Sequence, residues 1–215
     1  MTGAAAAPAR PGKIVCVGRN YREHAKELGN EVPAAPLLFL KPPSSVIGDG
    51  EPIVLPPASA RVEFEGEIGV VLGARLTRAS EADAARAVRG VAALNDVTAR
   101  DLQRSDGQWT RAKGFDSFCP IGPEARGGFD TAALQVVTLV NGAERQRGFA
   151  RDMVFAAPFL LSYISHVMTL EPGDVVATGT PAGVGPVAAG DVVEVLVSLD
   201  GRALSSVRNP VISLD

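Results

Sequence analysis

The segment Glu65-Gly66-Glu67-Ile68-Gly69-Val70-Val71-Leu72 joins two carboxylates to a short apolar run. Its length and branched residues are typical of a buried β-strand, which we predict over residues 68–72. Because side chains alternate between the two faces of a strand, Glu65 and Glu67 are expected on the same face. Their charges would repel one another there unless something offset them. The pattern leaves two interpretations open, a solvent-facing strand edge and a site for a cation.

Similar apolar runs, separated by glycine and proline, recur along the chain from Lys13 onward. Asn141-Gly142 and Asp200-Gly201 each interrupt a β-branched stretch, and both dipeptides favour the positive φ angles of tight hairpin turns. Antiparallel pairing is therefore expected around both. The lengths and spacings of the runs predict further strands at residues 14–17, 37–40, 53–55, 91–94, 136–140, 175–177 and 192–197.

Two short motifs predict where helices begin. Ser80 is followed three residues later by Asp83, a capping-box arrangement, and the Ala-rich segment that follows is expected to end near Gly90. Thr98 and Asp101 repeat the signature and predict a second helix start.

A third helix is expected at residues 157–168, where apolar residues recur at helical spacing and Pro158 suits the first turn. The apolar stretch 153–168 contains polar residues, and no stretch reaches the ~18 apolar residues of a membrane span. Strands outnumber helices in this pattern. We therefore predict a strand-dominated fold and a soluble, cytoplasmic protein.

The length and composition favour a single domain with a sizeable core. The chain has 215 residues, of which 46% are hydrophobic and 21% charged, values typical of globular proteins. Its net charge of -3 offers no general attraction for nucleic acid or an anionic membrane. Residues 1–12 are rich in Ala and Pro and lack the pattern of a signal peptide. We predict that they form a disordered tail before a domain spanning residues 13–215.

Several common kinds of active site lack support in the sequence. Cys16 and Cys119 lie in separate apolar runs and are expected to be buried, reduced thiols. The Gly- and Thr-rich stretch 178–185 could present amides to an anion, but it lacks the lysine of a phosphate-binding loop. The chain also lacks a Gly-x-Ser-x-Gly motif, so a covalent serine hydrolase is not indicated.

A third carboxylate strengthens the cation interpretation of Glu65 and Glu67. Asp96 follows the apolar run 91–94, so a buried strand would deliver it to the strand's end. Three carboxylates on rigid elements, without histidine or thiolate beside them, suit a hard divalent cation. Magnesium or manganese fits this set better than zinc.

His24 and Lys113 are further candidates for chemistry. His24 and Glu27 are three residues apart, so a helical turn would place both on one face and let the carboxylate orient the imidazole as a base. An exposed pair is the other interpretation. The second histidine, His166, is expected to be solvated, and Lys113, in a glycine-bearing loop, is either solvated or directed at a site.

The order and spacing of six motifs resemble the fumarylacetoacetate hydrolase family, in particular its short acylpyruvase-like branch. The resemblance runs from about Lys13 to Pro210. The motifs are Gly18-Arg19-Asn20-Tyr21 with His24 and Glu27, Leu38-Phe39-Leu40-Lys41-Pro42, Glu65-Gly66-Glu67, Asn95-Asp96-Val97-Thr98-Ala99-Arg100-Asp101, Lys113-Gly114-Phe115-Asp116 and Thr178-Gly179-Thr180-Pro181.

This resemblance implies a mixed-sheet, β-rich α+β catalytic fold in a single domain, commonly a homodimer. It also implies a mobile lid over the site, carried by the segment that contains His24. The roles that it implies are Mg²⁺ or Mn²⁺ ligation by Glu65, Glu67 and Asp96, water activation by His24 and Glu27, a substrate-facing Lys113, and polar contacts to an α-keto acid from Arg100, Gln103 and Thr180.

The reaction that we expect first is hydrolysis of a C–C bond in an acylpyruvate-type β-diketo acid, through an enolate held on the metal. His24 and Glu27 favour it because hydrolysis needs an activated water. The same intermediate serves decarboxylation or tautomerisation of oxaloacetate and isomerisation of 2-hydroxymuconate-type catabolites, which remain the alternative. A non-catalytic metabolite-binding dimer is the third interpretation.

Overall fold

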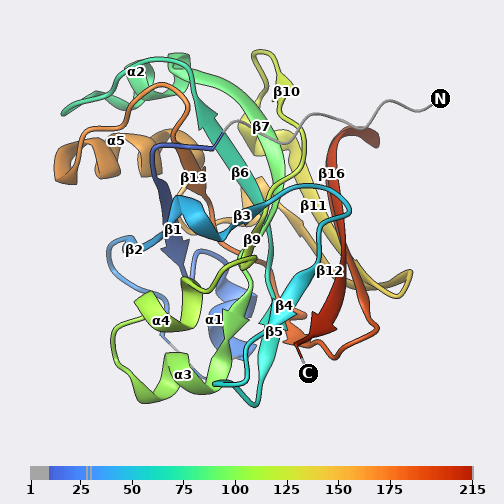
Figure 1. Cartoon of the computed structure of the whole chain (residues 1–215). Helices are drawn as coiled ribbons and strands as arrows, with labels where there is room; N and C mark the ends of the chain where they lie inside the picture. The colour runs from blue at the N-terminus through green and yellow to red at the C-terminus, as the bar shows by residue number, and fades with distance from the viewer. Residues whose placement is uncertain (1–9, 28, 30, 215) are drawn as a thin grey trace.

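The strand that carries Glu67 belongs to a six-stranded sheet in the order β10-β7-β6-β13-β1-β2 (Figure 1). The structure is a computed structural model that describes residues 10–27, 29 and 31–214; most of the predicted tail lies outside these residues. β1 and β13 run parallel and the other neighbours pair antiparallel, so the sheet is mixed, as predicted. The strands are β1 (Ile14–Gly18), β2 (Leu37–Lys41), β6 (Gly66–Leu72), β7 (Val88–Asn95), β10 (Ala125–Arg126) and β13 (Val175–Ala177).

A second, five-stranded sheet has the order β12-β11-β15-β16-β4. Both predicted hairpins lie here, with Asn141 and Gly142 at φ angles of 54° and 77° and Asp200 and Gly201 at 48° and 79°. The strands are β4 (Ile53–Leu55), β11 (Leu134–Val140), β12 (Ala143–Phe149), β15 (Val192–Leu199) and β16 (Arg202–Ser213). All eight strands predicted from the apolar runs are thereby confirmed, although several extend further than predicted.

Short strands and helices complete the structure and connect these sheets. β14, β5 and β8 form a three-stranded sheet, and β3 pairs with β9. The short strands are β3 (Val46–Ile47), β5 (Val62–Phe64), β8 (Thr98–Ala99), β9 (Cys119–Pro120) and β14 (Gly185–Pro186). The α-helices are α1 (Arg22–Glu27), α2 (Glu81–Arg86), α3 (Arg100–Ser105), α4 (Thr110–Lys113) and α5 (Ala157–Val167), and the 3₁₀ turns are η1 (Pro43–Ser45), η2 (Thr131–Ala133) and η3 (Ala150–Asp152).

The first helix prediction is confirmed at its start and wrong at its end. The Ser80 side chain accepts a hydrogen bond from the Asp83 amide and caps α2. The helix ends at Arg86 rather than near Gly90, because Val88 already pairs with Leu72 in the sheet.

The predicted cap at Thr98 is wrong. Thr98 belongs to β8, and its hydroxyl donates to the Asp96 carbonyl at 2.8 Å, so it shapes the turn after Asp96. α3 begins two residues later, after Ala99, which has no side chain able to cap it. The third prediction is confirmed: α5 carries Pro158 in its first turn and ends at Val167, and His166 is exposed.

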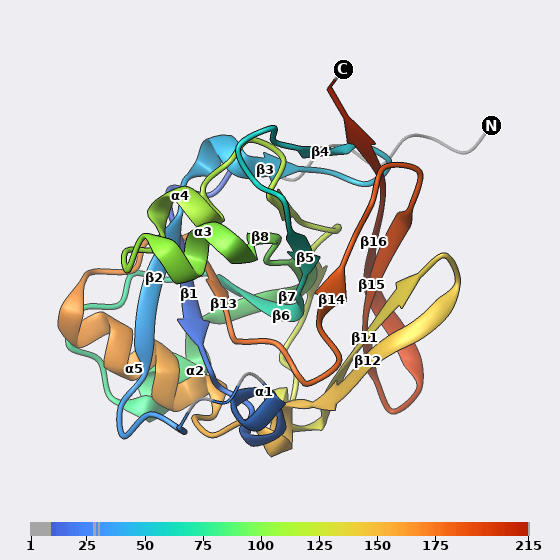
Figure 2. The ribbon, with the colours of Figure 1, turned by 90° about the horizontal axis from the view of Figure 1, so that it is seen from below.

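The six-stranded sheet is covered on both faces. On one side α2 and α5 lie across it, away from the β15–β16 hairpin (Figure 2). Val15 and Val17 of β1 pack there against Leu160 and Ile164 of α5. On the other side the five-stranded sheet packs on β6 and β7 through residues such as Leu134, Val136, Val195, Val197 and Val207. The sequence of β1 is consequently apolar on both of its faces.

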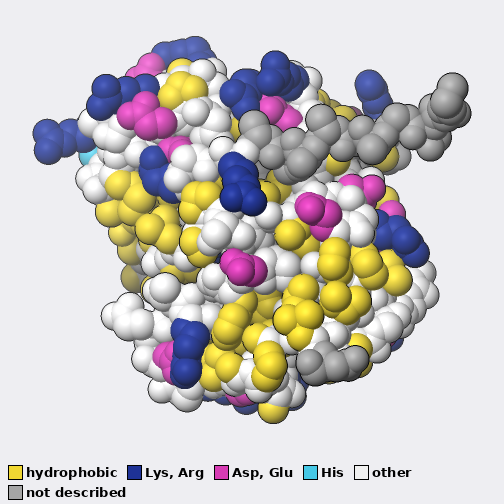
Figure 3. All heavy atoms as spheres, viewed as in Figure 1, with side chains coloured by type: hydrophobic (Ala, Val, Ile, Leu, Met, Phe, Trp, Pro, Cys, Tyr) yellow, Lys and Arg dark blue, Asp and Glu magenta, His cyan; other side chains and the backbone are white. Residues whose placement is uncertain are grey.

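The remaining general predictions concern thiols, charge and membranes. Cys16 and Cys119 are both buried and unpaired, and burial raises the pKa of the Cys119 thiol to about 12. In the face shown in Figure 3, acidic and basic side chains are interspersed rather than gathered by sign. Among the described residues, no helix combines the length and apolar character needed to cross a membrane.

Candidate active site

Three buried carboxylates converge at one end of the six-stranded sheet. Glu67 lies in β6, Glu65 immediately before it, and Asp96 immediately after β7. Because Gly66 pairs with Asn95 in the register, the ends of the two strands bring the carboxylates side by side. One oxygen from each lies within 4.8 Å of the others, and the residues are 5%, 1% and 1% exposed. The solvent-facing interpretation is therefore wrong, and the triad could hold a divalent metal ion.

Gly66 allows β6 to approach β11 closely between the two glutamates. A Cβ at this position would lie 1.9 Å from Oγ1 of Thr138, so a larger residue would displace β11 or β6. The Gly66 amide donates to Oε1 of Gln146 at 2.9 Å, and its carbonyl accepts from Oγ1 of Thr180 at 2.9 Å. These contacts fix the backbone from which Glu65 and Glu67 project.

Three buried cations face the carboxylates. Nζ of Lys113 donates to Oε2 of Glu65 at 2.9 Å and to Oδ2 of Asp96 at 2.6 Å. Nζ of Lys41 donates to Oδ1 of Asp96 at 2.7 Å, and Nη2 of Arg100 donates to Oε1 of Glu65 at 2.5 Å. The loop assigned to Lys113 is wrong, since this residue ends α4 and is 1% exposed. Its side chain is directed at the site and is not solvated.

The electrostatics of the triad fit a cation. Burial raises the pKa of Glu67 well above its usual range, and the Asp96 and Glu65 carboxylates add to this effect. Burial also opposes ionisation of Glu65, but Lys113 and Arg100 outweigh it and hold that pKa well below its usual range. A cation bound beside Glu67 would relieve the repulsion among the three carboxylates. The all-oxygen donor set is the one that Mg²⁺ and Mn²⁺ prefer.

His24 and Glu27 lie on one face of α1, as their spacing predicts. Nδ1 of His24 is 3.3 Å from Oε2 of Glu27, and His24 is only 4% exposed, so the exposed-pair interpretation is wrong for the imidazole. The Gly183 amide donates to Oε1 of Glu27 at 3.0 Å, which attaches α1 to the loop before β14. Glu27 is thus positioned to fix the orientation of the imidazole.

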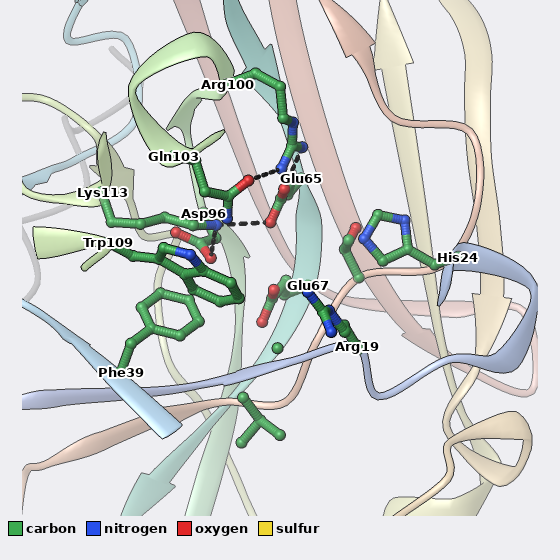
Figure 4. Close-up of a pocket in the computed structure, with 13 residues that line it drawn as sticks. Arg19, His24, Phe39, Glu65, Glu67, Asp96, Arg100, Gln103, Trp109 and Lys113 are labelled. Atoms are coloured by element: carbon green, nitrogen blue, oxygen red, sulfur yellow. Dashed lines mark hydrogen bonds and ion pairs between the residues drawn. The ribbon is translucent and has the colours of Figure 1, made fainter. Parts of the chain in front are cut away.

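A cavity of about 50 Å³ brings these groups together. The carboxylates lie at its centre, with His24 on one side and Phe39 and Trp109 on the other (Figure 4). The rings of Phe39 and Trp109 meet edge to face, with centroids 5.2 Å apart. Of the nine site residues predicted from the sequence, only Glu27 does not line the cavity; the others are His24, Glu65, Glu67, Asp96, Arg100, Gln103, Lys113 and Thr180.

The three predicted substrate contacts already have partners within the protein. Arg100 donates through Nε to Oε2 of Glu63 at 2.7 Å and through Nη1 to Oε1 of Gln103 at 2.5 Å. Oγ1 of Thr180 accepts from Nε2 of Gln146 at 2.7 Å. These contacts hold Gln103 and Thr180 at the edge of the cavity, and their role toward a substrate stays a prediction.

Sequence reasoning assigned no role to Lys41, Arg19 or the Phe39–Trp109 pair. Lys41 directly follows the apolar run 37–40, and it is the one buried residue of β2, whose leucines and phenylalanine are exposed or half-buried, so the run did not point to it. Trp109 and Phe39 are far apart in the chain and meet only in the folded structure. No spacing in the sequence indicates that contact.

Lys41→Met is expected to destabilise the metal-free protein by roughly 3 kcal/mol, because it leaves Asp96 with one fewer buried cation. Adding Mg²⁺ should restore part of this loss, since a divalent cation would offset the same carboxylate. Thermal unfolding with and without Mg²⁺ measures both effects. The variant should therefore gain more stability from Mg²⁺ than the wild type does.

The matched control is Arg86→Met, which breaks an exposed pair with Asp83 whose side chains are 71% and 54% exposed. Such surface pairs contribute less than about 1 kcal/mol. Equal destabilisation by the two substitutions would contradict the role assigned to Lys41.

Comparison with known proteins places this site in a family. The family model described as fumarylacetoacetate (FAA) hydrolase, C-terminal, matches residues 13–212. The chain belongs to the fumarylacetoacetate hydrolase family. The β-rich, mixed-sheet, single-domain fold expected from the sequence is therefore confirmed.

Named relatives of similar length indicate which chemistry the family fold supports. An oxaloacetate tautomerase of Escherichia coli (strain K12) is 40% identical over 201 residues, covering 90% of this chain and 91% of that protein. A mitochondrial oxaloacetate tautomerase of Arabidopsis thaliana is 46% identical over 185 residues, covering 83% and 82% of the two chains. The crystal structure of a 5-carboxymethyl-2-hydroxymuconate delta-isomerase from Mycobacterium smegmatis has a TM-score of 0.88 at 42% identity, covering 97% of this chain and 82% of that one.

These findings bear on the branch within the fumarylacetoacetate hydrolase family. The three relatives are named as tautomerases or an isomerase, so C–C hydrolysis is not the reaction that their names favour. Membership of the acylpyruvase-like branch stays a prediction. The chain is an enzyme of the family, and an acidic triad that could hold a metal lies in its cavity.

Proposed function

We propose that this enzyme interconverts the keto and enol forms of a small α-keto diacid, with oxaloacetate as the first candidate, when a divalent ion is bound. The observation that carries the proposal is the single small cavity where His24 faces Glu65, Glu67 and Asp96. A proton-transfer group and a cation site lie together there. The tautomerase and isomerase names of the relatives support this reaction over C–C hydrolysis.

A divalent ion held by the three carboxylates would draw electron density from the keto and carboxylate oxygens of an α-keto acid. His24 would take a proton from the carbon beside the keto group, and the C–H electron pair would become the new C=C bond. The C=O π pair would move onto the keto oxygen, which would take a proton from the imidazolium or from water and become the enol hydroxyl. The reverse sequence regenerates the ketone, so no atom other than the proton moves.

The neighbouring side chains assist this proton transfer. Glu27, 3.3 Å from Nδ1 of His24, would stabilise the imidazolium that forms. Lys113 is buried against Glu65 and Asp96, and these carboxylates outweigh burial and raise the pKa of its ammonium. The ammonium therefore stays charged and can offset negative charge on the reacting oxygen.

Hydrolysis of an acylpyruvate is the second candidate, and the His24–Glu27 pair is the observation that favours it. The pair could equally activate water. Hydrolysis, however, needs an activated water in addition to the keto acid, and the named relatives are tautomerases and an isomerase. We therefore place tautomerisation first.

The test follows the absorbance of enol-oxaloacetate, with the spontaneous rate subtracted, in Mg²⁺, in Mn²⁺ and after chelation. Pyruvate release from an acylpyruvate and carbon dioxide release from oxaloacetate are measured in parallel. We expect tautomerisation to be the fastest activity and to disappear with the metal. Fast acylpyruvate cleavage with no effect on the enol would overturn the proposal in favour of hydrolysis.

Three further properties are part of the proposal. Mg²⁺ or Mn²⁺ is the expected ion because the donors are all oxygens. A homodimer and a cytoplasmic location follow from the resemblance and the sequence, and both stay predictions. Sedimentation of the purified protein would test the dimer.

A further inference from the structure

The cations around the carboxylates differ in how their donors are used. Lys41, Lys113 and Arg100 each donate to Glu65, Asp96 or both. Arg19 also lines the cavity and is half-buried. Within residues 10–27, 29 and 31–214, its guanidinium makes no hydrogen bond or ion pair. It is therefore the cavity cation whose donors remain available to a ligand.

The backbone of Arg19 is held in a conformation that arginine rarely adopts. Its φ angle is 59°, in the left-handed region that favours glycine. The neighbouring Asn20, fully buried, fixes this conformation: Nδ2 donates to the Thr178 and Phe155 carbonyls at 2.7 and 3.0 Å, and Oδ1 accepts from the Phe155 amide at 2.8 Å. Glycine would adopt this backbone conformation without strain. The protein instead has arginine at position 19, which indicates a role for its side chain.

Figure 4 shows where this strained residue directs its side chain. Arg19 extends from the segment after β1 toward Glu67, on the side of the cavity where His24 enters. The aromatic wall of Phe39 and Trp109 lies on the other side. A ligand whose α-keto carboxylate faced the triad would therefore have a cationic side and an apolar side available for its other end.

We propose that Arg19 binds the second carboxylate of a keto diacid and so makes the enzyme selective for diacids over monoacids. The inference rests on the proposed function, which it deepens by naming the residue that selects diacids. A guanidinium offers two parallel N–H donors that match a carboxylate, and charge-assisted pairs of this kind are among the stronger hydrogen bonds. The aromatic wall offers a carboxylate no such partner.

The same contact would link substrate recognition to placement of the base. Arg19 lies on the segment that joins β1 to α1, and His24 lies five residues later, within α1. An ion pair between Arg19 and the distal carboxylate would hold this segment against the substrate. A diacid would thereby be bound more tightly and would also meet a better positioned His24.

Measurements of ligand affinity test this inference independently of the reaction. Calorimetry in Mg²⁺ would compare 3,3-difluoro-oxaloacetate, which cannot enolise, with the monoacid 2-oxobutanoate, in which a methyl group replaces the distal carboxylate. Oxalate, which lacks a separate distal group, reports on the metal site alone. We expect wild type to prefer the diacid, and Arg19→Gln to weaken diacid binding roughly 10- to 100-fold. Oxalate affinity should stay within about threefold.

Two further variants make the result interpretable. Arg19→Gly removes the strain at positive φ, so it should fold and show the same loss if Arg19→Gln proves unstable. Arg22→Gln changes an exposed arginine of α1 that does not line the cavity, and it should leave diacid binding unchanged. Arg19→Lys should retain part of the preference, because it keeps the charge without the paired donors.

The possible outcomes distinguish the two proposals. An Arg19-dependent diacid preference in a protein without tautomerase activity would overturn the proposed function and keep this inference. Active tautomerase with no diacid preference, or with a preference that survives in Arg19→Gln, would overturn the inference. Equal weakening of oxalate and diacid would also overturn it, since Arg19 would then serve the metal site.

Discussion

Glu67→Gln is expected to lose metal-dependent activity by roughly 10³-fold or more, while the metal-free protein becomes no less stable. The amide keeps the shape of the side chain but removes the charge that a divalent ion needs, and such an ion contributes several kcal/mol to the reaction. In metal-free protein, Glu67 is buried beside Asp96 and Glu65, which raises its pKa. Its ionised form therefore opposes folding at neutral pH, and glutamine removes that cost.

The raised pKa of Glu67 determines how the stability of metal-free protein depends on pH. A carboxylate whose folded pKa is raised stabilises the fold only at low pH and loses that contribution as the pH rises. Thermal unfolding of metal-free protein at pH 7 should thus favour Glu67→Gln over wild type, and added Mg²⁺ should stabilise only wild type. The exposed Glu81→Gln serves as control. A Glu67→Gln protein that is still stabilised by Mg²⁺ would remove Glu67 from the ligand set.

His24→Gln is expected to slow tautomerisation by a factor on the order of 10² to 10⁴, the usual contribution of a positioned acid–base group. Its effect on Mg²⁺ affinity should be small, because His24 is not among the clustered carboxylates. Enol absorbance gives the rate, and calorimetry gives the affinity. The other histidine, His166, is exposed on α5, so His166→Gln should match wild type in both. Near-normal turnover in His24→Gln would eliminate the imidazole as the proton-transfer group.

Most of the strands were predictable because their apolar runs are buried on at least one face of a sheet. β1 is the clearest case, with four consecutive buried residues, Ile14–Val17, between α5 and the opposite side of the sheet. The prediction of a helix start at Thr98 was wrong because it used only local sequence. A local capping motif was outweighed by pairing between Thr98 and Glu63, which only the assembled sheet reveals.

The candidate site was only partly accessible to sequence reasoning. Same-face spacing correctly related Glu65 to Glu67, and the end of an apolar run correctly placed Asp96 near them. Spacing alone left each residue with an alternative, and the family resemblance decided between them. The role of Lys41 was not predicted, because Lys41 contacts Asp96 across 55 positions in the sequence. That contact depends on how β2 and β7 lie in the folded sheet.

The order of the six-stranded sheet has a consequence for biosynthesis. β13 lies between β6, which carries Glu67, and β1, which leads to His24. The ribosome makes β1 and β6 early. The strand that pairs with both of them, β13, begins only at Val175. At about 5–20 residues per second, the nascent chain spends roughly five to twenty seconds with β6 complete and β13 missing. Protease protection of arrested chains should therefore extend across β1 and β6 only once β13 has left the exit tunnel.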